Sequence, residues 1–207
     1  MEHDHSPDSD ADLLSASLEA PELFGDLYDR YAGVIHRFVA RRLGWSVADD
    51  LTADVFLVAF RSRQRFDNRG GTARPWLYGI ANNLVRKHRR EEVRALLALG
   101  RTGADPLTRQ WAGEATDAVE GRSLEAPLAS ALAALAARDR DVLLLIAWAD
   151  LAYEEVAQAL RIPVGTVRSR LNRARSQVRR SLAADAQSAP TAHETRLIPP
   201  VKPREAI

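Results

Sequence analysis

Residues 151–175 read LAYEEVAQALRIPVGTVRSRLNRAR, and their pattern predicts the fold of the C-terminal half of the chain. It predicts a short helix over residues 154–160, a break at residues 161–163 that contains a proline, and a longer helix over residues 164–180. The longer helix has apolar residues spaced by four, three and four positions, which predicts a buried face. That face consists of Val167, Leu171, Ala174 and Val178. Two helices joined by a tight turn are typical of a helix-turn-helix.

The remaining faces of the longer helix carry side chains that suit the major groove of DNA. Arginine can form two hydrogen bonds with guanine and asparagine two with adenine, while serine and threonine reach bases or phosphates. The candidate DNA-binding residues on this helix are Thr166, Arg168, Ser169, Arg170, Asn172, Arg173 and Arg175. The alternative is an ordinary helical hairpin with an arginine-rich surface. A helix-turn-helix alone names no function, because repressors, recombinases and activators all use it.

The charge of the chain is strongly separated along the sequence, although 29 basic and 28 acidic residues leave a net charge of only +1. Residues 1–26 hold eight acids and no lysine or arginine, whereas residues 61–94 hold ten bases and three acids. Residues 161–180 hold seven arginines and no acid. Two separate basic blocks are typical of a protein that binds a polyanion, since each base placed on a phosphate releases counterions. Solvated helix faces are the alternative explanation.

The composition excludes several classes of protein. A chain of 207 residues that is 46% hydrophobic and 28% charged has room for one ordinary globular domain or two small ones. The absence of cysteine excludes disulfide frameworks, zinc knuckles and thiol nucleophiles, and it favours the cytoplasm. No apolar run approaches the ~18 residues that a membrane helix needs. The five histidines are scattered, so we expect no metal site, no cofactor and no catalytic site.

Apolar spacing predicts three helices in the N-terminal half. The first begins near Phe24 and ends at Gly44, and the second begins with Ser46 as a candidate N-cap and runs to about residue 65. Residues 67–71 read DNRGG, which predicts a loop. The third helix begins at Pro75, and Trp76 falls in register with its apolar face, which favours a core position. Its other face carries Asn82, Asn83, Arg86, Lys87, Arg89 and Arg90.

The helical pattern dissolves over residues 95–122, where four glycines and one proline predict a flexible linker. A second helical block opens at Pro127, and its run of apolar residues at 142–148 predicts a buried core helix. From residue 183 onward, alanine, proline and mixed charges predict a disordered tail. No segment shows convincing strand periodicity. The predicted fold class is therefore all-α, with two small helical domains joined by a linker and a helix-turn-helix in the second.

Three stretches together resemble bacterial RNA polymerase sigma factors of the extracytoplasmic-function (ECF) class. Residues 151–175 resemble the family's DNA-reading segment without a gap, residues 48–57 (ADDLTADVFL) its polymerase-binding helix, and residues 74–90 (RPWLYGIANNLVRKHRR) its promoter-melting segment. The order of the segments and the intervening linker are also the family's. The resemblance implies sigma region 2 over residues 23–94, a linker over residues 95–122 and sigma region 4 over residues 123–182. The composition of the two ends predicts an acidic disordered leader over residues 1–22 and a disordered tail over residues 183–207.

The resemblance implies a subunit that directs core RNA polymerase to specific promoters and helps to melt them, while the catalysis belongs to the polymerase. The implied partners are core RNA polymerase, promoter DNA and an anti-sigma factor. The implied polymerase-binding residues are Asp49, Asp50, Asp54 and Phe56. The implied contacts to the upstream promoter box are Asn68, Arg74, Asn82, Asn83, Arg86, Lys87 and Arg90, and the helix described first would read the distal box.

Two other functions and one open question remain at this point. An autonomous helix-turn-helix regulator would bind DNA as a dimer without polymerase, but it leaves residues 24–94 unexplained. A DNA-processing enzyme such as a recombinase would need a catalytic serine or tyrosine within an arginine cluster in a folded catalytic domain. The acidic N-terminus is either a plain disordered leader or a screen that competes with DNA for the basic faces.

Overall fold

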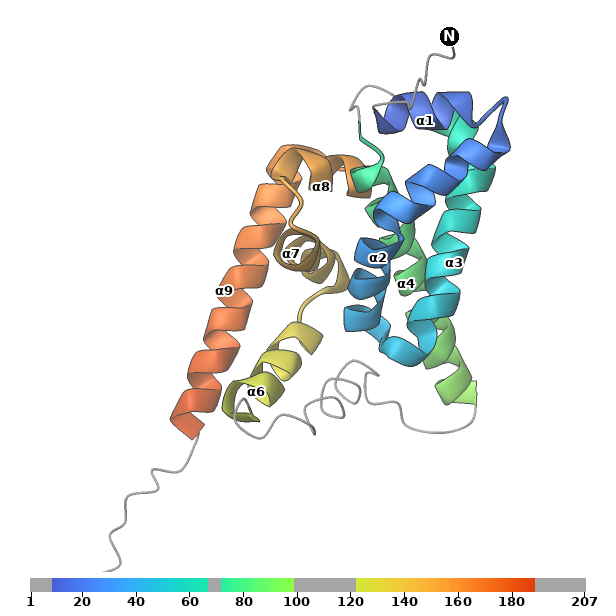
Figure 1. The fold of residues 1–207 in the computed structure, drawn as a ribbon. Helices are drawn as coiled ribbons and strands as arrows, with labels where there is room; N and C mark the ends of the chain where they lie inside the picture. The colour runs from blue at the N-terminus through green and yellow to red at the C-terminus, as the bar shows by residue number, and fades with distance from the viewer. Residues whose placement is uncertain (1–8, 67–71, 99–121, 189–207) are drawn as a thin grey trace, which may run out of the picture.

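The computed structural model describes residues 9–66, 72–98 and 122–188, and in these ranges the only secondary structure is helical (Figure 1). The all-α prediction is confirmed. The helices are α1 (Asp10–Ala16), the 3-10 turn η1 (Pro21–Leu23), α2 (Phe24–Leu43), α3 (Trp45–Ser62), the 3-10 turn η2 (Arg63–Arg65), α4 (Arg74–Ala98), α6 (Arg122–Ala133), α7 (Ala137–Ala149), α8 (Tyr153–Leu160) and α9 (Val164–Ser188).

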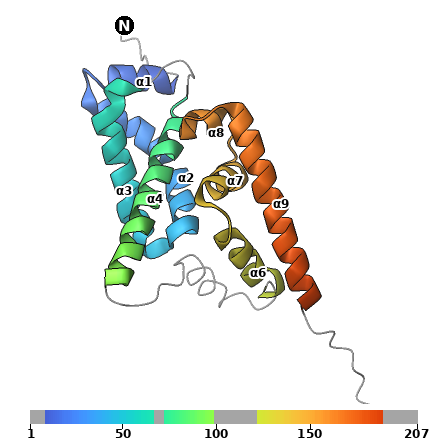
Figure 2. The ribbon, with the colours of Figure 1, turned by 180° about the vertical axis from the view of Figure 1, so that it is seen from behind.

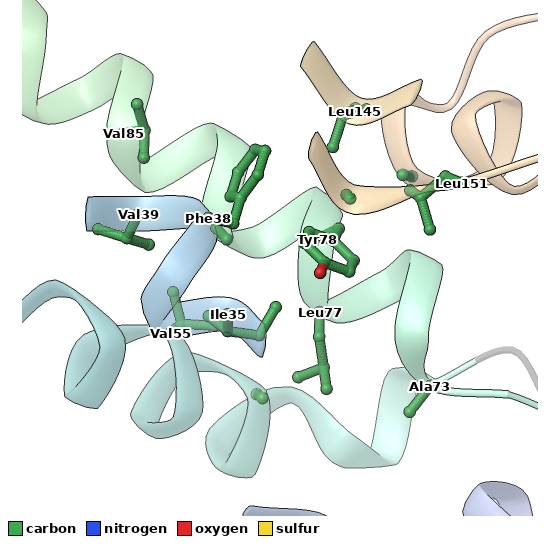
Figure 3. Packing of buried hydrophobic residues seen from close by; sticks show 14 of the residues in the cluster. Ile35, Phe38, Val39, Val55, Ala73, Leu77, Tyr78, Val85, Leu145 and Leu151 are labelled. Atoms are coloured by element: carbon green, nitrogen blue, oxygen red, sulfur yellow. The ribbon is translucent and has the colours of Figure 1, made fainter. Parts of the chain in front are cut away.

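Helices α2, α3 and α4 pack together around the apolar faces that their sequences predict. Ile35, Phe38, Val55 and Leu77 are at most 1% exposed, and the Phe38 and Tyr78 rings meet edge to face with centroids 5.2 Å apart (Figure 3). Helix α2 ends at Gly44, whose φ of 84° favours glycine. Helix α3 follows at once, so the expectation that Ser46 caps it is wrong. The sharp turn at Gly44 leaves no room for a separate cap residue.

Helices α6 to α9 form the second half of the molecule, and α8 and α9 make the expected helix-turn-helix. Arg161 adopts a φ of 52°, which ends α8 and turns the chain toward α9. The predicted face of α9 is turned inward, with Val167, Leu171 and Ala174 buried and Val178 packed against the Leu132 cluster. The apolar run of α7 is a core helix as expected. One boundary differs, because α6 begins at Arg122 and Pro127 lies inside it rather than at its start.

The predicted disordered ends are partly helical. Helix α1 lies within the expected leader, where Leu13 and Leu14 are buried, so that expectation is wrong for residues 10–16. Helix α9 continues to Ser188 through an alanine-rich stretch of high helix propensity, so the expectation of disorder is wrong for residues 183–188. Helix α4 likewise extends into the expected linker. The predictions for residues 1–8, 67–71, 99–121 and 189–207 concern parts of the chain outside the described residues.

The two halves of the molecule pack directly against each other (Figures 1 and 2). Helix α8 lies across α4, and α7 contacts both α2 and α4. Buried side chains of the second half, among them Leu145 and Leu151, belong to the same apolar core as Phe38 and Tyr78 (Figure 3). The sequence predicted two domains joined by a linker and gave no sign of this shared core.

Candidate nucleic-acid interface

The polar face of α9 is open to solvent. Arg168, Ser169, Asn172 and Arg175 are exposed, while Thr166 and Arg170 are half-buried. Arg173 is exposed but already paired, because its guanidinium donates to both carboxylate oxygens of Asp139 on α7 at 3.1 Å. This pair raises the pKa of Arg173. The helix therefore presents arginine, serine and asparagine side chains together on the face opposite its buried residues, as binding in a major groove requires.

The acidic face of α3 is also exposed. Asp49, Asp50 and Asp54 all reach solvent, and one oxygen of Asp49 lies 2.9 Å from Nε2 of His36. Phe56 does not belong to this surface, because only 4% of it is exposed. Its ring packs edge to face against Tyr28 with centroids 4.8 Å apart. Phe56 is therefore a core residue, contrary to its expected place among the polymerase contacts.

Large apolar side chains of α2 and α3 are exposed as well, and sequence reasoning missed them. Trp45 is 66% exposed, and Tyr28, Leu57 and Val58 are also exposed. Exposed apolar groups of this size, gathered beside charges, are typical of a protein-binding surface. A signal was available only for Leu57, which falls outside the apolar period that buries the rest of α3. Trp45 and Val58 are in register with the buried residues of α3, so the sequence alone predicts that they are buried.

The expected upstream-box residues on α4 divide into two groups. Asn83, Lys87 and Arg90 are exposed, with the Lys87 amine 3.8 Å from a carboxylate oxygen of Glu91. Arg74, Asn82 and Arg86 instead make contacts within the molecule. Asn68 lies outside the described residues. Of the six expected residues that the structure describes, only these three are thus exposed to DNA in this conformation.

Asn82 is completely buried and is bonded to Arg42 at the end of α2, which is buried as well. One terminal nitrogen of Arg42 donates to the amide oxygen of Asn82 at 2.9 Å, and the other donates to the Asp141 carboxylate of α7 at 2.9 Å. Arg86 approaches the second oxygen of Asp141 at 3.6 Å. Burial lowers the pKa of Arg42, and Asp141 opposes that shift. The sequence gave no signal for this pair, because an arginine in the last turn of a helix normally faces solvent.

Two further contacts hold α4 against the second half. A terminal nitrogen of Arg74 donates to the carbonyl of Ala149 at the end of α7. Gly79 lies against α8, where a Cβ atom added to it would sit 2.5 Å from the carbonyl oxygen of Ala159. No real Cβ approaches an oxygen that closely, so this close packing of α4 and α8 requires glycine.

Arginines line two cavities along the contact between the halves. One of about 570 Å³ is lined by residues of α4, α8 and α9 and by the paired rings of Phe66 and Trp76, whose centroids are 5.2 Å apart. The other, of about 540 Å³, lies between α4 and α7. Asp141 is the one acidic side chain in either lining. The arginines are Arg42, Arg65, Arg86, Arg89, Arg90, Arg94, Arg138, Arg140, Arg161 and Arg170.

Neither a metal site nor a membrane helix is found in the part of the chain that the structure describes. It contains no group of three histidine, aspartate or glutamate side chains placed to hold a metal ion. Within the same ranges, no helix has the length and apolar character to cross a membrane. Arginine-rich helices with exposed polar faces are what remains, and they suit a nucleic-acid phosphate backbone.

The fold and these surfaces define an all-helical, DNA-binding protein with a helix-turn-helix in its second half. Comparison with protein families matches Sigma-70 region 2 to residues 27–95 and Sigma-70, region 4 to residues 126–178. The chain belongs to the ECF class of RNA polymerase sigma factors. Proteins of this family are regulatory subunits that direct RNA polymerase to specific promoters to initiate transcription.

Individual relatives agree with this assignment. The sigma factor HrpL of Pseudomonas syringae pv. syringae is 34% identical over 134 residues, which cover 65% of this chain and 72% of HrpL. The ECF sigma factor SigC of Mycobacterium tuberculosis is 35% identical over 155 residues, which cover 74% of this chain and 77% of SigC. The ECF sigma factor SigL of the same species is 30% identical over 173 residues, covering 83% and 96%.

Two solved structures share the fold. CnrH in complex with the cytosolic domain of CnrY gives a TM-score of 0.59 at 26% identity, covering 86% of this chain and 99% of CnrH. The sigma factor RpoE in complex with the anti-sigma factor NepR from Bartonella quintana gives a TM-score of 0.60 at 22% identity, covering 79% and 99%. The second likeness is one of fold alone.

Proposed function

We propose that this sigma factor binds core RNA polymerase through α3, melts the upstream promoter box with α4 and reads the distal box with α9. The observation that carries the proposal is the sorting of α9, whose apolar side chains are buried while Arg168, Ser169 and Asn172 face solvent. This sorting leaves groups that bond to base edges free on one face of a helix that the rest of its domain holds rigidly.

For core polymerase, the proposed contact combines charge with apolar area. Asp50 and Asp54 lie one turn apart on α3, and exposed Trp45 and Leu57 lie on the same helix. A partner helix with arginines opposite the acids and apolar side chains opposite the tryptophan would complement this surface. Trp45 and Tyr28 are added to the expected polymerase contacts. Phe56 stays in the core, where its ring packs against that of Tyr28.

For the upstream box, Asn83, Lys87 and Arg90 are exposed, whereas Arg74 and Arg86 contact the second half and Asn82 is bonded to Arg42 of α2. We infer that the described arrangement is a closed form and that the two halves separate before α4 engages DNA. Separation would release Arg74 and Arg86 to bind phosphates. It would also part Arg42 from Asp141, and Asn82 could then exchange its bond to Arg42 for a bond to a base edge. Their contacts could then help to offset the few kcal/mol that extruding a base costs.

We also propose an anti-sigma factor as a partner and the cytoplasm as the place of action. CnrH, a protein of the same fold, was solved with the cytosolic domain of CnrY, and RpoE of Bartonella quintana with an anti-sigma factor. A protein that bound across both halves would hold them in the closed form. We propose no catalytic role for this chain, because the family acts by regulating the polymerase.

In vitro transcription on a genomic promoter library, with core polymerase alone and with core plus this protein, tests the proposal. New start sites that share two spaced upstream boxes are the expected result. Arg168→Ala should weaken distal-box recognition by about 1–3 kcal/mol and leave polymerase binding intact. Asp54→Arg should do the reverse, because it places a positive charge on the acidic surface.

Matched variants control for the change of charge alone. Arg179→Ala removes a charge from an exposed site near the end of α9, and Glu19→Arg reverses an exposed acid outside α3; neither should alter transcription. If no start sites appear while the protein alone binds duplex DNA tightly, the chain acts as an autonomous regulator and the proposal fails. Loss of polymerase binding in Arg168→Ala would contradict the role given to α9.

A further inference from the structure

Helix α1 precedes residue 27, where the match to sigma-70 region 2 begins, yet it is firmly joined to that domain. Leu13 and Leu14 are at most 2% exposed, and α1 packs against α2 and η2. The Arg63 side chain of η2 donates to the carbonyl of Ser17, the residue that ends α1, at 3.3 Å. An acidic segment that looked like a leader is thus a fixed element of the fold.

Asp10, the first residue of α1, accepts four hydrogen bonds through its carboxylate. Asp10 is 4% exposed, and one of its carboxylate oxygens accepts from Arg30 of α2 at 2.5 Å. The other oxygen accepts from the Tyr31 hydroxyl at 2.6 Å, the Thr72 hydroxyl at 3.1 Å and the backbone amide of Ala73 at 2.7 Å. One carboxylate therefore joins three segments that are far apart in the sequence.

These donors keep the carboxylate ionised. Burial alone would raise the pKa of Asp10, but the hydrogen bonds from Tyr31, Ala73, Arg30 and Thr72 outweigh it and hold that pKa below its ordinary value. A negative charge here also faces the N-terminus of α4, where the helix dipole favours an anion. Asp10 thus reaches across from another helix to cap α4.

The capped residues lead directly into the helix that we assign to promoter melting. The Ala73 carbonyl accepts from the amide of Leu77 at 2.9 Å in the first turn of α4. The Thr72 hydroxyl accepts from the amide of Arg74 at 3.3 Å. Fixing Thr72 and Ala73 therefore fixes where α4 begins, and with it the backbone position from which the Arg74 side chain extends.

We propose that Asp10 is a positioning residue for promoter melting, because its carboxylate holds the first turn of α4 in place against α2. The proposal rests on the melting role proposed for α4. Capturing an extruded base costs stacking and pairing energy, so the capturing groups work best when their geometry is set beforehand. Sequence analysis left the acidic N-terminus with two possible roles, and this is a third one, since Asp10 acts inside the fold.

The test compares Asp10→Asn with Asp12→Asn in the full-length chain. Asp12 lies two residues further along α1 and is exposed, and its side chain is hydrogen-bonded to Ser9 among the described residues, so its replacement makes the same change of charge away from α4. The first readout is hydrogen exchange of the Ala73 amide. We expect it to quicken about 10-fold to 100-fold in Asp10→Asn, as loss of a hydrogen bond to a charged group predicts, and to stay unchanged in Asp12→Asn. Tyr31→Phe, which removes one donor, should give a smaller effect.

The second readout is open-complex formation with core polymerase on a promoter recovered by the transcription experiment. We expect Asp10→Asn to slow opening of duplex promoter at least about 10-fold and to approach wild-type activity on a template melted in advance, with core-polymerase binding unchanged. A purely structural role would lower all three measurements together, and that result would overturn the proposal. Equal opening rates for Asp10→Asn and Asp12→Asn would overturn it too. If wild-type protein opens no promoter, the proposed function fails instead, and hydrogen exchange still tests the contact between Asp10 and α4.

Discussion

Helices α4 and α9 have similar sequences in outline but different surroundings. Each carries an apolar face and a polar face rich in arginine and asparagine, and each is expected to bind promoter DNA. On α9 the asparagine of that face, Asn172, is exposed. On α4 the corresponding kind of residue, Asn82, is buried and bonded to Arg42 of α2, which is bonded in turn to Asp141 of α7. The difference lies in this buried pair, which joins the domain of α4 to the second half and has no counterpart at Asn172.

This difference shows that helical periodicity answers only one of two questions. It predicts which face a helix turns toward its own domain, because burial of apolar area drives that choice. It does not predict whether a second domain covers the polar face. The arginine-lined cavities beside α4 show that this covering brings many positive charges together around Asp141, so the closed form depends on a few specific contacts.

The largest effect should come from Asp141→Ala, which removes the buried partner of Arg42, the residue to which Asn82 is bonded. Removing one partner of a buried ion pair costs about 3–5 kcal/mol, because the remaining charge is left without compensation. Arg42 can regain water if the halves separate, so we expect opening rather than unfolding. Energy transfer between dyes on cysteines placed at exposed Asp29 and Ser130 measures this, and the native chain has no cysteine to interfere.

A double variant gives the control for that experiment. Arg42→Met combined with Asp141→Leu replaces the buried pair by apolar groups, a change that is often neutral or stabilising. The double variant should close again while Asp141→Ala stays open. Identical energy transfer in wild type and Asp141→Ala would mean that the ion pair does not hold the halves together.

A smaller effect is expected from Gly79→Ala, which tests the contact between α4 and α8. Alanine favours a helix interior over glycine by about 0.5–1 kcal/mol, and Gly33→Ala in α2 should show this gain, because its Cβ would meet only the end of Arg37, at 3.5 Å. At Gly79 the same methyl meets the Ala159 carbonyl at 2.5 Å, and overpacking of this kind costs about 1–3 kcal/mol. We expect lower energy transfer in Gly79→Ala with the N-terminal domain still folded. Unchanged transfer would show that α8 can shift without leaving α4.

Most of the fold was predictable because most of it follows from local periodicity. The face of α9, the stop at Gly44 and the core run of α7 all depend on residues within a few turns of one another. Helix α1 was missed because it is short and lies within residues 1–26, where eight acids and no lysine or arginine favour a disordered leader, although Leu13 and Leu14 already supply a buried face.

The candidate site was predictable only where a helix acts alone. The exposed residues of α9 and the acids of α3 follow from their own helices. Phe56 was misplaced because a resemblance transfers a position without saying which way its side chain points. Arg42, Asp141 and Gly79 were missed because their roles arise between elements that are distant in sequence, and a single sequence contains no local signal for such pairs.

The smallest expected effect is on stability at acid pH. It concerns the start of α4, where Asp10 is bonded, and not α9. The pKa of Asp10 is lower in the folded protein than the ordinary value of about 3.9, so its charged form stabilises the fold. That contribution is complete above the ordinary pKa and is lost as the pH falls through the lower folded value. The difference in unfolding free energy between wild type and Asp10→Asn should therefore be constant near neutral pH and shrink below about pH 4. Denaturant unfolding of both proteins over a pH series measures it, and a difference that shrank well above that pH would show that another group, not Asp10, sets the acid sensitivity of the start of α4.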